Sequence, residues 1–356
     1  MTETLAPGAV IGILGGGQLG RMLSVAAARL GLKTHIYEPG AHPPAGDVAH
    51  AVTTAAYEDH AALARFAASV DVITYEFENI PTEALDVLEA HRPIRPGREA
   101  LRISQDRLTE KAWANGLGVA TAPFADITDL ASLEQALARI GTPAILKTRR
   151  FGYDGKGQVR IDDPAQARAA LAELAGAPAI LEGFVPFQRE VSVIAARGQD
   201  GQVAAYDPGE NVHKGGILRT TTIPARLTNA QRTDAVLLAG CLLNALDYVG
   251  VMGVELFVTP GGLILNEIAP RVHNSGHWTQ NGCAVDQFEQ HVRAVAGWPL
   301  GDGGRHSDVV MENLIGDDVT RVPDLARQPD TALHLYGKAE VKAGRKMGHV
   351  NRILRA

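Results

Sequence analysis

A glycine-rich turn near the N-terminus, set between an apolar stretch and a helix-forming stretch, constrains the fold more than any other feature. Residues 10–14 are predicted to form a short strand, and residues 15–20, with the sequence Gly-Gly-Gly-Gln-Leu-Gly, the turn. Residues 21–30 form a predicted helix that ends at Gly31, and residues 34–37 a second strand. Two strands separated by a helix pair in parallel. The N-terminal part is therefore predicted to be a Rossmann-like unit.

The same turn has a functional interpretation. Gly15, Gly17 and Gly20 have the spacing of the dinucleotide-binding fingerprint, and Glu38 ends the next predicted strand, where such sites hold the ribose. A glycine-rich turn at a helix N-terminus nevertheless binds any phosphate-like anion, because free N–H groups and the helix dipole point at it. This motif alone leaves an NAD site, a site for another anion and a turn without a ligand open.

The rest of the chain indicates further domains. A chain of 356 residues exceeds what one hydrophobic core usually holds, so two or three domains are expected. Pro93, Pro96 and Gly97 mark a boundary, and a helical stretch is predicted after it, over residues 99–115.

Beyond residue 144 the pattern changes to strands joined by glycine turns, which is typical of antiparallel α+β domains. The elements predicted there are strands at 144–148, 158–161, 179–182 and 190–196, a helix at 229–246, a hairpin at 251–268 and a late strand at 333–336. We therefore predict an α/β and α+β multidomain chain, divided into residues 1–97, 98–298 and 299–356.

Composition narrows the functional classes. The formal charge of −6 gives no basic surface for nucleic acid. Cys241 and Cys283 are too few for a disulfide framework, so each is expected to be a small core residue in a reducing cytoplasm. Residues 1–10 lack the basic region of a signal peptide, and apolar runs such as 235–243 are too short to span a bilayer.

Two glutamates in the predicted hairpin give the strongest chemical signal. Glu255 and Glu267 are equidistant from Gly261 in the turn, so a symmetric hairpin places them opposite each other on one face. Opposed carboxylates in apolar strands repel unless a cation lies between them. Mg²⁺ suits such a pair, because it is usually held by one or two carboxylates and substrate phosphates. The alternative is two strand-end glutamates in solvent, and a bulge near the turn would undo the pairing.

Two stretches before the hairpin have the character of a nucleotide site. Lys147 ends an apolar strand and precedes a glycine-rich loop at 152–158, a combination that suits phosphates, although a flexible hairpin tip is the alternative. Residues 180–190 connect two strands through Gly183 and Pro186; their backbone suits an adenine edge and Glu190 the ribose hydroxyls. An ordinary strand connection is the alternative there.

Polar residues follow the hairpin and recur near the C-terminus. Arg271 is suited to gripping an oxyanion, with His273 and Asn274 as hydrogen-bond partners, whereas His277 is expected to be structural. Lys338, Lys342, Arg345 and Lys346 suit a phosphate monoester or form a solvated basic tail.

The order of these signals resembles the ATP-grasp superfamily. Five stretches resemble one family within it, the 5-(carboxyamino)imidazole ribonucleotide synthases, across nearly the whole chain. They are residues 15–22 (GGGQLGRM), 75–79 (YEFEN), 151–158 (FGYDGKGQ), 270–277 (PRVHNSGH) and 344–349 (GRKMGH). The resemblance implies a Rossmann-like pre-ATP-grasp domain, an ATP-grasp domain with a lid at about 119–185, and a small C-terminal domain that completes the substrate site.

The resemblance also implies a reaction and a set of site residues. ATP phosphorylates bicarbonate, and the resulting carboxyphosphate carboxylates 5-aminoimidazole ribonucleotide with release of ADP and phosphate. ATP binding is assigned to Arg107, Lys147, Gly152, Tyr153, Asp154, Gly155, Lys156, Gly157, Gln158, Glu182, Gly183, Phe184, Val185, Glu190, His213, Asn266 and Glu267. The ribonucleotide is assigned to Gln18, Leu19, Glu76, Tyr153, Asp154, Lys338, Arg345 and Lys346.

The remaining assignments concern the metal and catalysis. Glu255 and Glu267 are the expected ligands of Mg²⁺, with Mn²⁺ as an alternative, and Arg271, His273 and Asn274 are the expected bicarbonate site. Asp154 is the candidate base for the substrate amine. A cytoplasmic homodimer without nucleic-acid or membrane partners is expected. The alternatives are an ATP-grasp ligase that uses formate or an amino acid, an NAD-dependent oxidoreductase and a non-catalytic paralogue.

Overall fold

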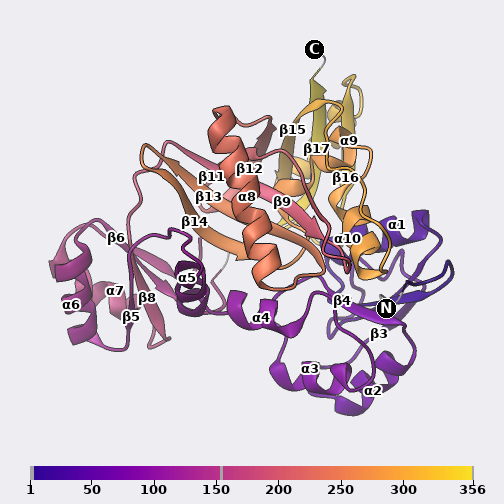
Figure 1. The fold of residues 1–356 in the computed structure, drawn as a ribbon, viewed down its shortest axis with the longest axis horizontal. Helices are drawn as coiled ribbons and strands as arrows, with labels where there is room; N and C mark the ends of the chain where they lie inside the picture. The colour runs from indigo at the N-terminus through magenta and orange to yellow at the C-terminus, as the bar shows by residue number, and fades with distance from the viewer. Residues whose placement is uncertain (1–3, 153–154, 355–356) are drawn as a thin grey trace.

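The N-terminal unit is a parallel sheet flanked by helices, as predicted. The computed structural model describes residues 4–152 and 155–354. β1 (Val10–Leu14), β2 (Lys33–Tyr37), β3 (Ala51–Thr53) and β4 (Val72–Tyr75) form the order β3-β2-β1-β4, with every pair parallel. Helix α1 (Gln18–Arg29) follows the glycine turn, and α2 (His60–Ala68) and α3 (Thr82–Glu89) pack against each other at the foot of the molecule (Figure 1).

The prediction of one continuous helix over residues 99–115 is wrong. Two helices, α4 (Arg98–Ser104) and α5 (Arg107–Gly116), occupy this stretch. Asp106 separates them, because its carboxylate accepts hydrogen bonds from the N–H groups of Leu108 and Thr109 and so caps α5. The break places Arg107 in the first turn of α5, at the edge of the central pocket.

A small antiparallel sheet forms a lobe of its own at the side of the molecule (Figure 1). Its strand order is β5-β8-β6-β7, from β5 (Phe124–Ile127), β6 (Ala144–Thr148), β7 (Gln158–Ile161) and β8 (Ala179–Gly183). Helices α6 (Leu130–Ile140) and α7 (Ala167–Glu173) pack on it around a separate apolar core that includes Leu137 and Leu181. This lobe falls within the predicted lid at about 119–185 and delivers Lys147 and Glu182.

The large sheet unites the central and C-terminal parts of the chain. Its order is β14-β13-β9-β11-β12-β15-β17-β16, with β10 (Val203–Ala205) paired to β9. The central strands are β9 (Arg189–Arg197), β11 (Gly209–Lys214), β12 (Ile217–Ile223), β13 (Gly250–Thr259) and β14 (Gly262–Ala269). The C-terminal strands β15 (Asp308–Ile315), β16 (Thr331–Leu335) and β17 (Lys346–Leu354) extend it through the antiparallel pair β12 and β15.

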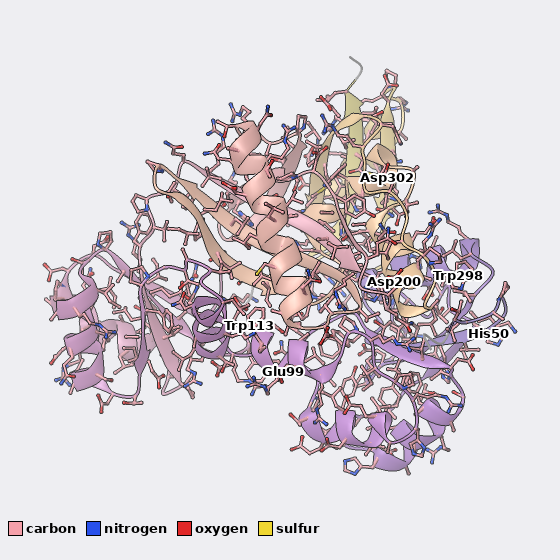
Figure 2. All side chains as sticks on the ribbon, in the orientation of Figure 1. His50, Glu99, Trp113, Asp200, Trp298 and Asp302 are labelled. Carbon is pink, nitrogen blue, oxygen red and sulfur yellow. The ribbon has the colours of Figure 1, made fainter. Side chains whose placement is uncertain are left out.

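Helices on the large sheet tie it to the first unit. Helix α8 (Asn229–Ala245) lies across one face (Figure 1), and α10 (Gln287–Val295) packs against β13, β9 and α1. Trp113 packs on the core beneath α8, and Trp298 donates from Nε1 to the carbonyl of Leu5 at 2.7 Å (Figure 2). The described part of the chain contains no helix long and apolar enough to cross a membrane.

The prediction for the cysteines is half right. Cys283 is buried, whereas Cys241 lies exposed on α8, and both thiols are free. The prediction of a core position failed for Cys241 because α8 carries apolar residues around much of its circumference, and only one stripe of them, including Ala239 and Leu242, reaches the sheet.

Candidate active site

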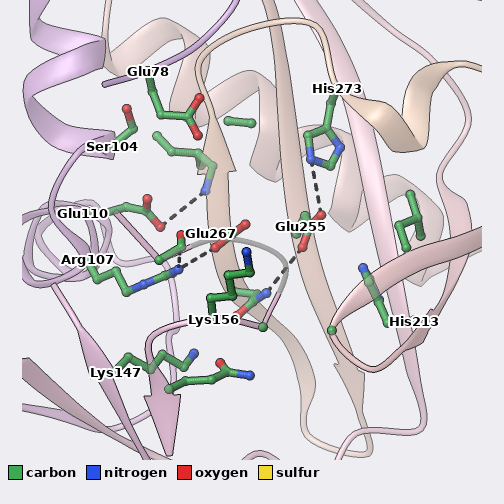
Figure 3. A pocket seen from close by; sticks show the side chains of 18 of the residues that line it. Glu78, Ser104, Arg107, Glu110, Lys147, Lys156, His213, Glu255, Glu267 and His273 are labelled. Carbon is green, nitrogen blue, oxygen red and sulfur yellow. Dashed lines mark hydrogen bonds and ion pairs between the residues drawn. The ribbon is translucent and has the colours of Figure 1, made fainter. Parts of the chain in front are cut away.

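A cavity of about 640 Å³ lies where the first unit, the lid lobe and the large sheet meet (Figure 3). It brings together most of the residues predicted for the site, although they are spread over more than 300 positions of the chain. Those that line it are Gln18, Leu19, Glu76, Arg107, Lys147, Gly152, Gly155, Lys156, Gln158, Glu182, Gly183, Phe184, Val185, Glu190, His213, Glu255, Asn266, Glu267, Arg271, His273, Asn274 and Lys346. Gly157, Lys338 and Arg345 do not line it, and Tyr153 and Asp154 lie outside the described residues.

Glu255 and Glu267 do face each other across the hairpin, but not for the predicted reason. The turn is Pro260-Gly261, which pairs Thr259 with Gly262 and is therefore not symmetric about Gly261. Continued without interruption, that register would set Glu255 opposite Asn266. A bulge between the pairs Leu256–Leu265 and Glu255–Glu267 shifts the register by one residue. The bulge thus creates the carboxylate pair that a regular two-residue hairpin would have lost.

The two carboxylates differ in their surroundings. Burial and the charge of Glu267 raise the pKa of Glu255 to about 7. Burial acts in the same sense on Glu267, but Arg107, whose Nη1 lies 2.9 Å from Glu267 Oε2, outweighs it and lowers the pKa of Glu267. At neutral pH the pair therefore holds at least one negative charge facing a second ionisable carboxyl, an arrangement that a cation relieves.

The same residues fit a hard divalent cation. Asn266, the bulge residue, donates to Glu255 Oε2 at 3.4 Å and adds an amide oxygen beside the two carboxylates. Among the described residues no three His, Cys, Asp or Glu side chains are grouped to enclose a metal. Two carboxylates suit Mg²⁺, which completes its shell with water and substrate phosphates rather than with protein groups alone.

A buried ion cluster sets the position of Lys147. Its Nζ lies 2.9 Å from Glu182 Oε2, which is also 3.4 Å from the ammonium of Lys111 on α5. Burial works against ionisation of Glu182, but the charges of Lys147 and Lys111 outweigh it and lower the pKa of that carboxyl. Lys147 itself has a lowered pKa, because burial outweighs the attraction of Glu182. Its ammonium is thus held at the cavity wall, beside Arg107 (Figure 3).

The connector after β8 forms an apolar and polar wall next to this cluster. Phe187 stacks on Phe257 with ring centroids 4.7 Å apart, and Phe184 is 40% exposed toward the cavity. Glu190 on β9 meets His213 on β11, with 2.6 Å between Glu190 Oε2 and His213 Nδ1. Flat apolar rings beside a carboxylate and backbone carbonyls suit a purine base and its ribose.

The loop after β14 carries buried polar groups. Arg271 donates from Nε and Nη2 to the two oxygens of Glu78, at 2.7 and 3.2 Å, and its Nη1 reaches the carbonyl of Val272. The guanidinium that we expected to grip an oxyanion is therefore engaged by Glu78. Asn274 differs, because neither polar atom of its buried amide has a partner among the described residues. An amide left unpaired beside a cavity is costly unless a ligand completes it.

The glycine turn is occupied by carboxylates of the protein itself. Glu76 accepts hydrogen bonds from the N–H groups of Gly17 and Gly20, the latter at 2.6 Å, and Glu38 accepts from that of Gly16 at 2.8 Å. A Cβ on Gly17 would lie 2.6 Å from Glu76 Oε1. These glycines therefore admit an internal carboxylate where a dinucleotide would place its pyrophosphate. This arrangement speaks against the NAD hypothesis.

The C-terminal cations lie around the same region. Lys338 donates to the carbonyl of Lys346 at 2.7 Å, and Lys346 lines the main cavity. Arg345 lines a neighbouring cavity of about 450 Å³ together with Gly16, Glu38 and Glu76, and Glu76 borders both cavities. The first unit and Arg345, which immediately precedes β17, thus line a second cavity that shares Glu76 with the main one.

Sequence reasoning missed three residues at the site: Glu78, Glu110 and Lys111. Glu78 stands in the YEFEN stretch, so its position was available although no role was assigned to it. Glu110 and Lys111 are buried charges on α5, a helix that was predicted without its break. Burial and the charge of Glu267 raise the pKa of Glu110 to about 8. That Glu110 and Lys111 are buried beside the site becomes visible only once the fold is known.

Three domain families match the chain in succession. The ribonucleotide synthetase preATP-grasp domain matches residues 9–105, the ATP-grasp domain residues 112–288, and the phosphoribosylaminoimidazole carboxylase C-terminal domain residues 309–355. The predicted architecture of three parts is thereby confirmed, whereas boundaries at residues 97 and 298 stay a prediction.

Whole-chain comparisons agree with the domain families. The N5-carboxyaminoimidazole ribonucleotide synthase of Brucella melitensis is 57% identical over 353 residues, which cover 98% of this chain and 98% of that protein. An N5-carboxyaminoimidazole ribonucleotide synthetase solved with ADP has a TM-score of 0.96 and 41% identity, over 99% of this chain and 94% of the other. The Aspergillus clavatus enzyme, solved with ADP and 5-aminoimidazole ribonucleotide, has a TM-score of 0.92 and 30% identity, over 98% and 94%. The chain belongs to the N5-carboxyaminoimidazole ribonucleotide synthase family.

Proposed function

We propose that this chain uses ATP and bicarbonate to carboxylate 5-aminoimidazole ribonucleotide, through carboxyphosphate, in purine biosynthesis. The observation that carries the proposal is the composition of the main cavity. One wall has the lysine, the apolar rings and the carboxylate of a nucleotide site, and the opposite wall has the Arg271, His273 and Asn274 loop. A second cavity, lined in part by Arg345, adjoins it. Three ligands can therefore lie in contact, as a transfer from ATP through bicarbonate to an amine requires.

ATP is proposed to lie along the lid side of the cavity. Residues 182–185 and Glu190 hold adenine and ribose, with His213 fixing Glu190. Lys147, Arg107 and the 152–158 loop neutralise the phosphates, because phosphoryl transfer depends on positioning and charge compensation. Glu255 and Glu267 hold Mg²⁺, with Mn²⁺ as an alternative, and the ion when bound neutralises phosphate charge.

Bicarbonate is proposed to lie between the carboxylate pair and the loop after β14. Asn274 supplies its unpaired amide, and His273 lies across from Glu255 with 3.4 Å between Nε2 and Oε1. Arg271 keeps its hydrogen bonds to Glu78 and contributes its positive charge beside the anion. These groups stabilise negative charge that spreads as carboxyphosphate forms.

The aminoimidazole ribonucleotide is proposed to span the two cavities. Gln18, Leu19 and Glu76 border its place on the first unit, and Lys338, Arg345 and Lys346 supply positive charge for its phosphate. Tyr153 and Asp154 are proposed to contact it as well, Asp154 as the base for the amine. The lid lobe would then exclude water, which carboxyphosphate requires because it hydrolyses readily.

The test is ADP release from the purified protein with ATP, Mg²⁺ and bicarbonate, measured with and without 5-aminoimidazole ribonucleotide. The proposal expects strong stimulation that requires both bicarbonate and the ribonucleotide. Turnover that depends on formate instead of bicarbonate would show that the protein is a different, formate-using ATP-grasp ligase. ATP binding without any stimulation would refute the carboxylase function and leave the family assignment standing.

We also propose a homodimer in the cytoplasm. The family resemblance supports the assembly, and two free thiols suit a reducing compartment. Sedimentation equilibrium tests the first part, and a mass of one chain at micromolar concentration would contradict it.

A further inference from the structure

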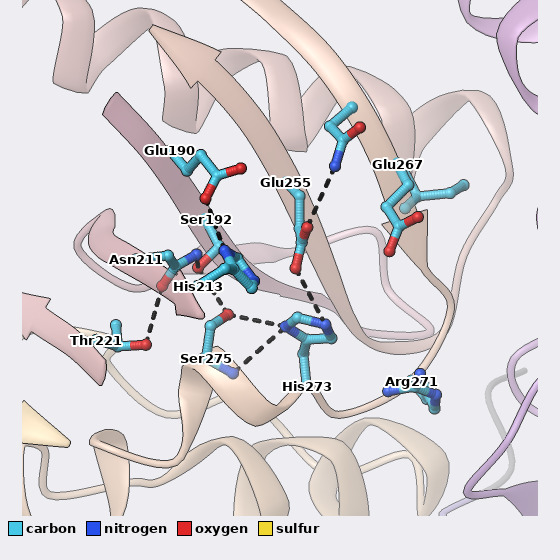
Figure 4. Close-up of polar contacts among 12 residues, drawn as sticks. Glu190, Ser192, Asn211, His213, Thr221, Glu255, Glu267, Arg271, His273 and Ser275 are labelled. Carbon is cyan, nitrogen blue, oxygen red and sulfur yellow. Dashed lines mark hydrogen bonds and ion pairs between the residues drawn. The ribbon is translucent and has the colours of Figure 1, made fainter. Parts of the chain in front are cut away.

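A line of buried polar side chains leads from the middle of the large sheet to His273 (Figure 4). Thr221 on β12 donates to Asn211 Oδ1 on β11 at 2.9 Å, and Asn211 Nδ2 donates to Ser192 Oγ on β9 at 3.1 Å. Ser192 Oγ lies 2.6 Å from Ser275 Oγ, which lies 2.8 Å from His273 Nδ1. All four leading residues are buried, from 0% exposure at Thr221 and Ser275 to 6% at Asn211.

Burying this line of polar side chains costs free energy that a purely structural role does not explain. Each buried hydroxyl or amide loses its water and recovers little beyond that loss from one hydrogen bond. Apolar side chains of similar size would hold β9, β11 and β12 together at lower cost. Satisfied buried networks do fix a single arrangement of their members, however. The group at the end of this one is the imidazole at the cavity wall.

The line has a direction, and the backbone sets it. The N–H of Ser275 donates to His273 Nδ1 at 3.4 Å. A backbone N–H can only donate, so Nδ1 is an acceptor and carries no proton. The Ser275 hydroxyl then has to point its proton at Nδ1 and accept from Ser192.

The rest of the line follows from the same count of protons. Ser192, having given its one proton to Ser275, accepts from the Asn211 amide, whose oxygen is left for Thr221. Each hydroxyl donates its single proton once, and the Asn211 amide uses one of its two N–H groups. In the opposite direction, an Nδ1–H would face the N–H of Ser275.

We propose that Thr221, Asn211, Ser192 and Ser275 are positioning residues that hold His273 as the neutral tautomer with its proton on Nε2. The inference rests on the proposed function of the cavity for one consequence only. His273 then offers bicarbonate and carboxyphosphate a hydrogen-bond donor and does not act as a base at that nitrogen. Nε2 faces Glu255 Oε1 across 3.4 Å, on the cavity side of the ring. The proton of the substrate amine therefore leaves to another group.

The tautomer can be observed directly. In full-length protein labelled with ¹⁵N-histidine, long-range ¹H–¹⁵N correlation distinguishes protonated from bare ring nitrogens, and the His273 signals are those missing from His273→Gln. We expect a protonated Nε2 and a bare Nδ1 at neutral pH. A protonated Nδ1 overturns the proposal. This measurement does not depend on turnover, so it stands even if the proposed carboxylation fails.

Variants along the line test whether it holds the imidazole in place. In Ser275→Ala the backbone N–H still donates to Nδ1, so we expect Nε2 to stay protonated, but the ring loses its hydroxyl partner. Its signals should shift or broaden, and kcat/KM for bicarbonate should fall about 10–100-fold, as for other partners that orient a functional histidine. The KM for ATP should stay within about twofold, because the nucleotide wall is untouched. Ser24→Ala is the matched control, since Ser24 Oγ is buried on α1 without a partner among the described residues. Unchanged signals and bicarbonate kinetics in Ser275→Ala overturn the proposal.

Two replacements of the histidine separate a donor from a base. The amide nitrogen of Gln reaches about as far as Nε2, whereas that of Asn reaches only about as far as Nδ1. His273→Gln should therefore keep at least about tenfold more bicarbonate-dependent turnover than His273→Asn, since one well-placed donor is worth this or more. Equal loss in the two variants contradicts the donor role.

Discussion

Replacing Glu267 by Gln tests the carboxylate pair most sharply. The substitution keeps size and one hydrogen-bond acceptor and removes one charge. Arg107, 2.9 Å away, can still donate to the remaining oxygen. The Glu267 side chain is 38% exposed, so solvent screens its ion pair and the change in the free energy of unfolding should stay near 1 kcal/mol or below. A large effect on activity without a large effect on stability is therefore expected.

The magnitude follows from what the carboxylate does. The hairpin offers two carboxylates to a cation, and the substitution removes half of that charge. Losing one preorganised group that compensates transition-state charge costs about 10²–10³-fold in turnover, or about 3–4 kcal/mol at 1.36 kcal/mol per tenfold. The Mg²⁺ concentration for half-maximal activity should rise as well, because the protein holds the ion with one carboxylate fewer.

The assay is ADP release with ATP, bicarbonate and the ribonucleotide over a series of Mg²⁺ concentrations, with thermal unfolding as the check on folding. Glu210→Gln makes the same chemical change on β11, at a carboxylate that pairs with Arg226 outside the cavity, and should leave turnover unchanged. Near-normal turnover of the Glu267 variant refutes the metal role. Reduced turnover with a raised KM for ATP and an unchanged Mg²⁺ dependence would instead make Glu267 a positioning residue for Arg107.

Three further predictions concern other parts of the site. Lys338→Ala should raise the KM for the ribonucleotide and leave that for ATP unchanged; equal effects on both contradict the phosphate role. Gly17→Ala should lower the free energy of unfolding by about 1–3 kcal/mol, because the new Cβ meets Glu76, and a Glu76→Ala background should remove that penalty in urea titrations. Glu182→Gln should cost about 3–5 kcal/mol at neutral pH by leaving the buried Lys111 and the partly buried Lys147 without a counter-charge. Since the folded-state pKa of Glu182 lies below its ordinary value of about 4.3, this difference should shrink as the pH falls below about 4; a constant difference refutes the ion cluster as its cause.

The elements that were predicted correctly from the sequence are those in which the local sequence pattern and the tertiary packing favour the same structure. β1 and β6 were delimited to the residue, because each is a short apolar run that a glycine or proline bounds. β11 and β12 were not foreseen, since Asn211 and Thr221 interrupt the apolar alternation that reveals a strand. Those polar residues belong to the line that ends at His273. A pattern read for hydrophobicity alone passes over strands that carry a buried polar network.

For the carboxylate pair, the predicted pairing is right although the reasoning that led to it is wrong. Counting from Gly261 assumed a symmetric turn, and the turn is not symmetric. The pairing survives because Asn266 bulges, and no rule of turn geometry announces a bulge five residues away. The sequence Asn266-Glu267 nevertheless pointed to the metal site through its resemblance to the ATP-grasp superfamily. Local geometry alone would have left Glu255 facing an asparagine.

The acidic stretch after β4 explains how a Rossmann-like unit serves a ligase. Ligands of parallel sheets bind at the carboxyl ends of the strands, and β4 ends at Tyr75. Glu76 turns back to fill the glycine turn, and Glu78 reaches forward to Arg271 in the central domain. One strand end thus closes the site that a dinucleotide would use and anchors the loop proposed for bicarbonate. Glu76 borders both cavities, so an amine bound beside it lies next to the place where a carboxyl donor would form. In this chain the glycine fingerprint allows a carboxylate to pack closely against the turn, and that carboxylate lies where the two cavities adjoin.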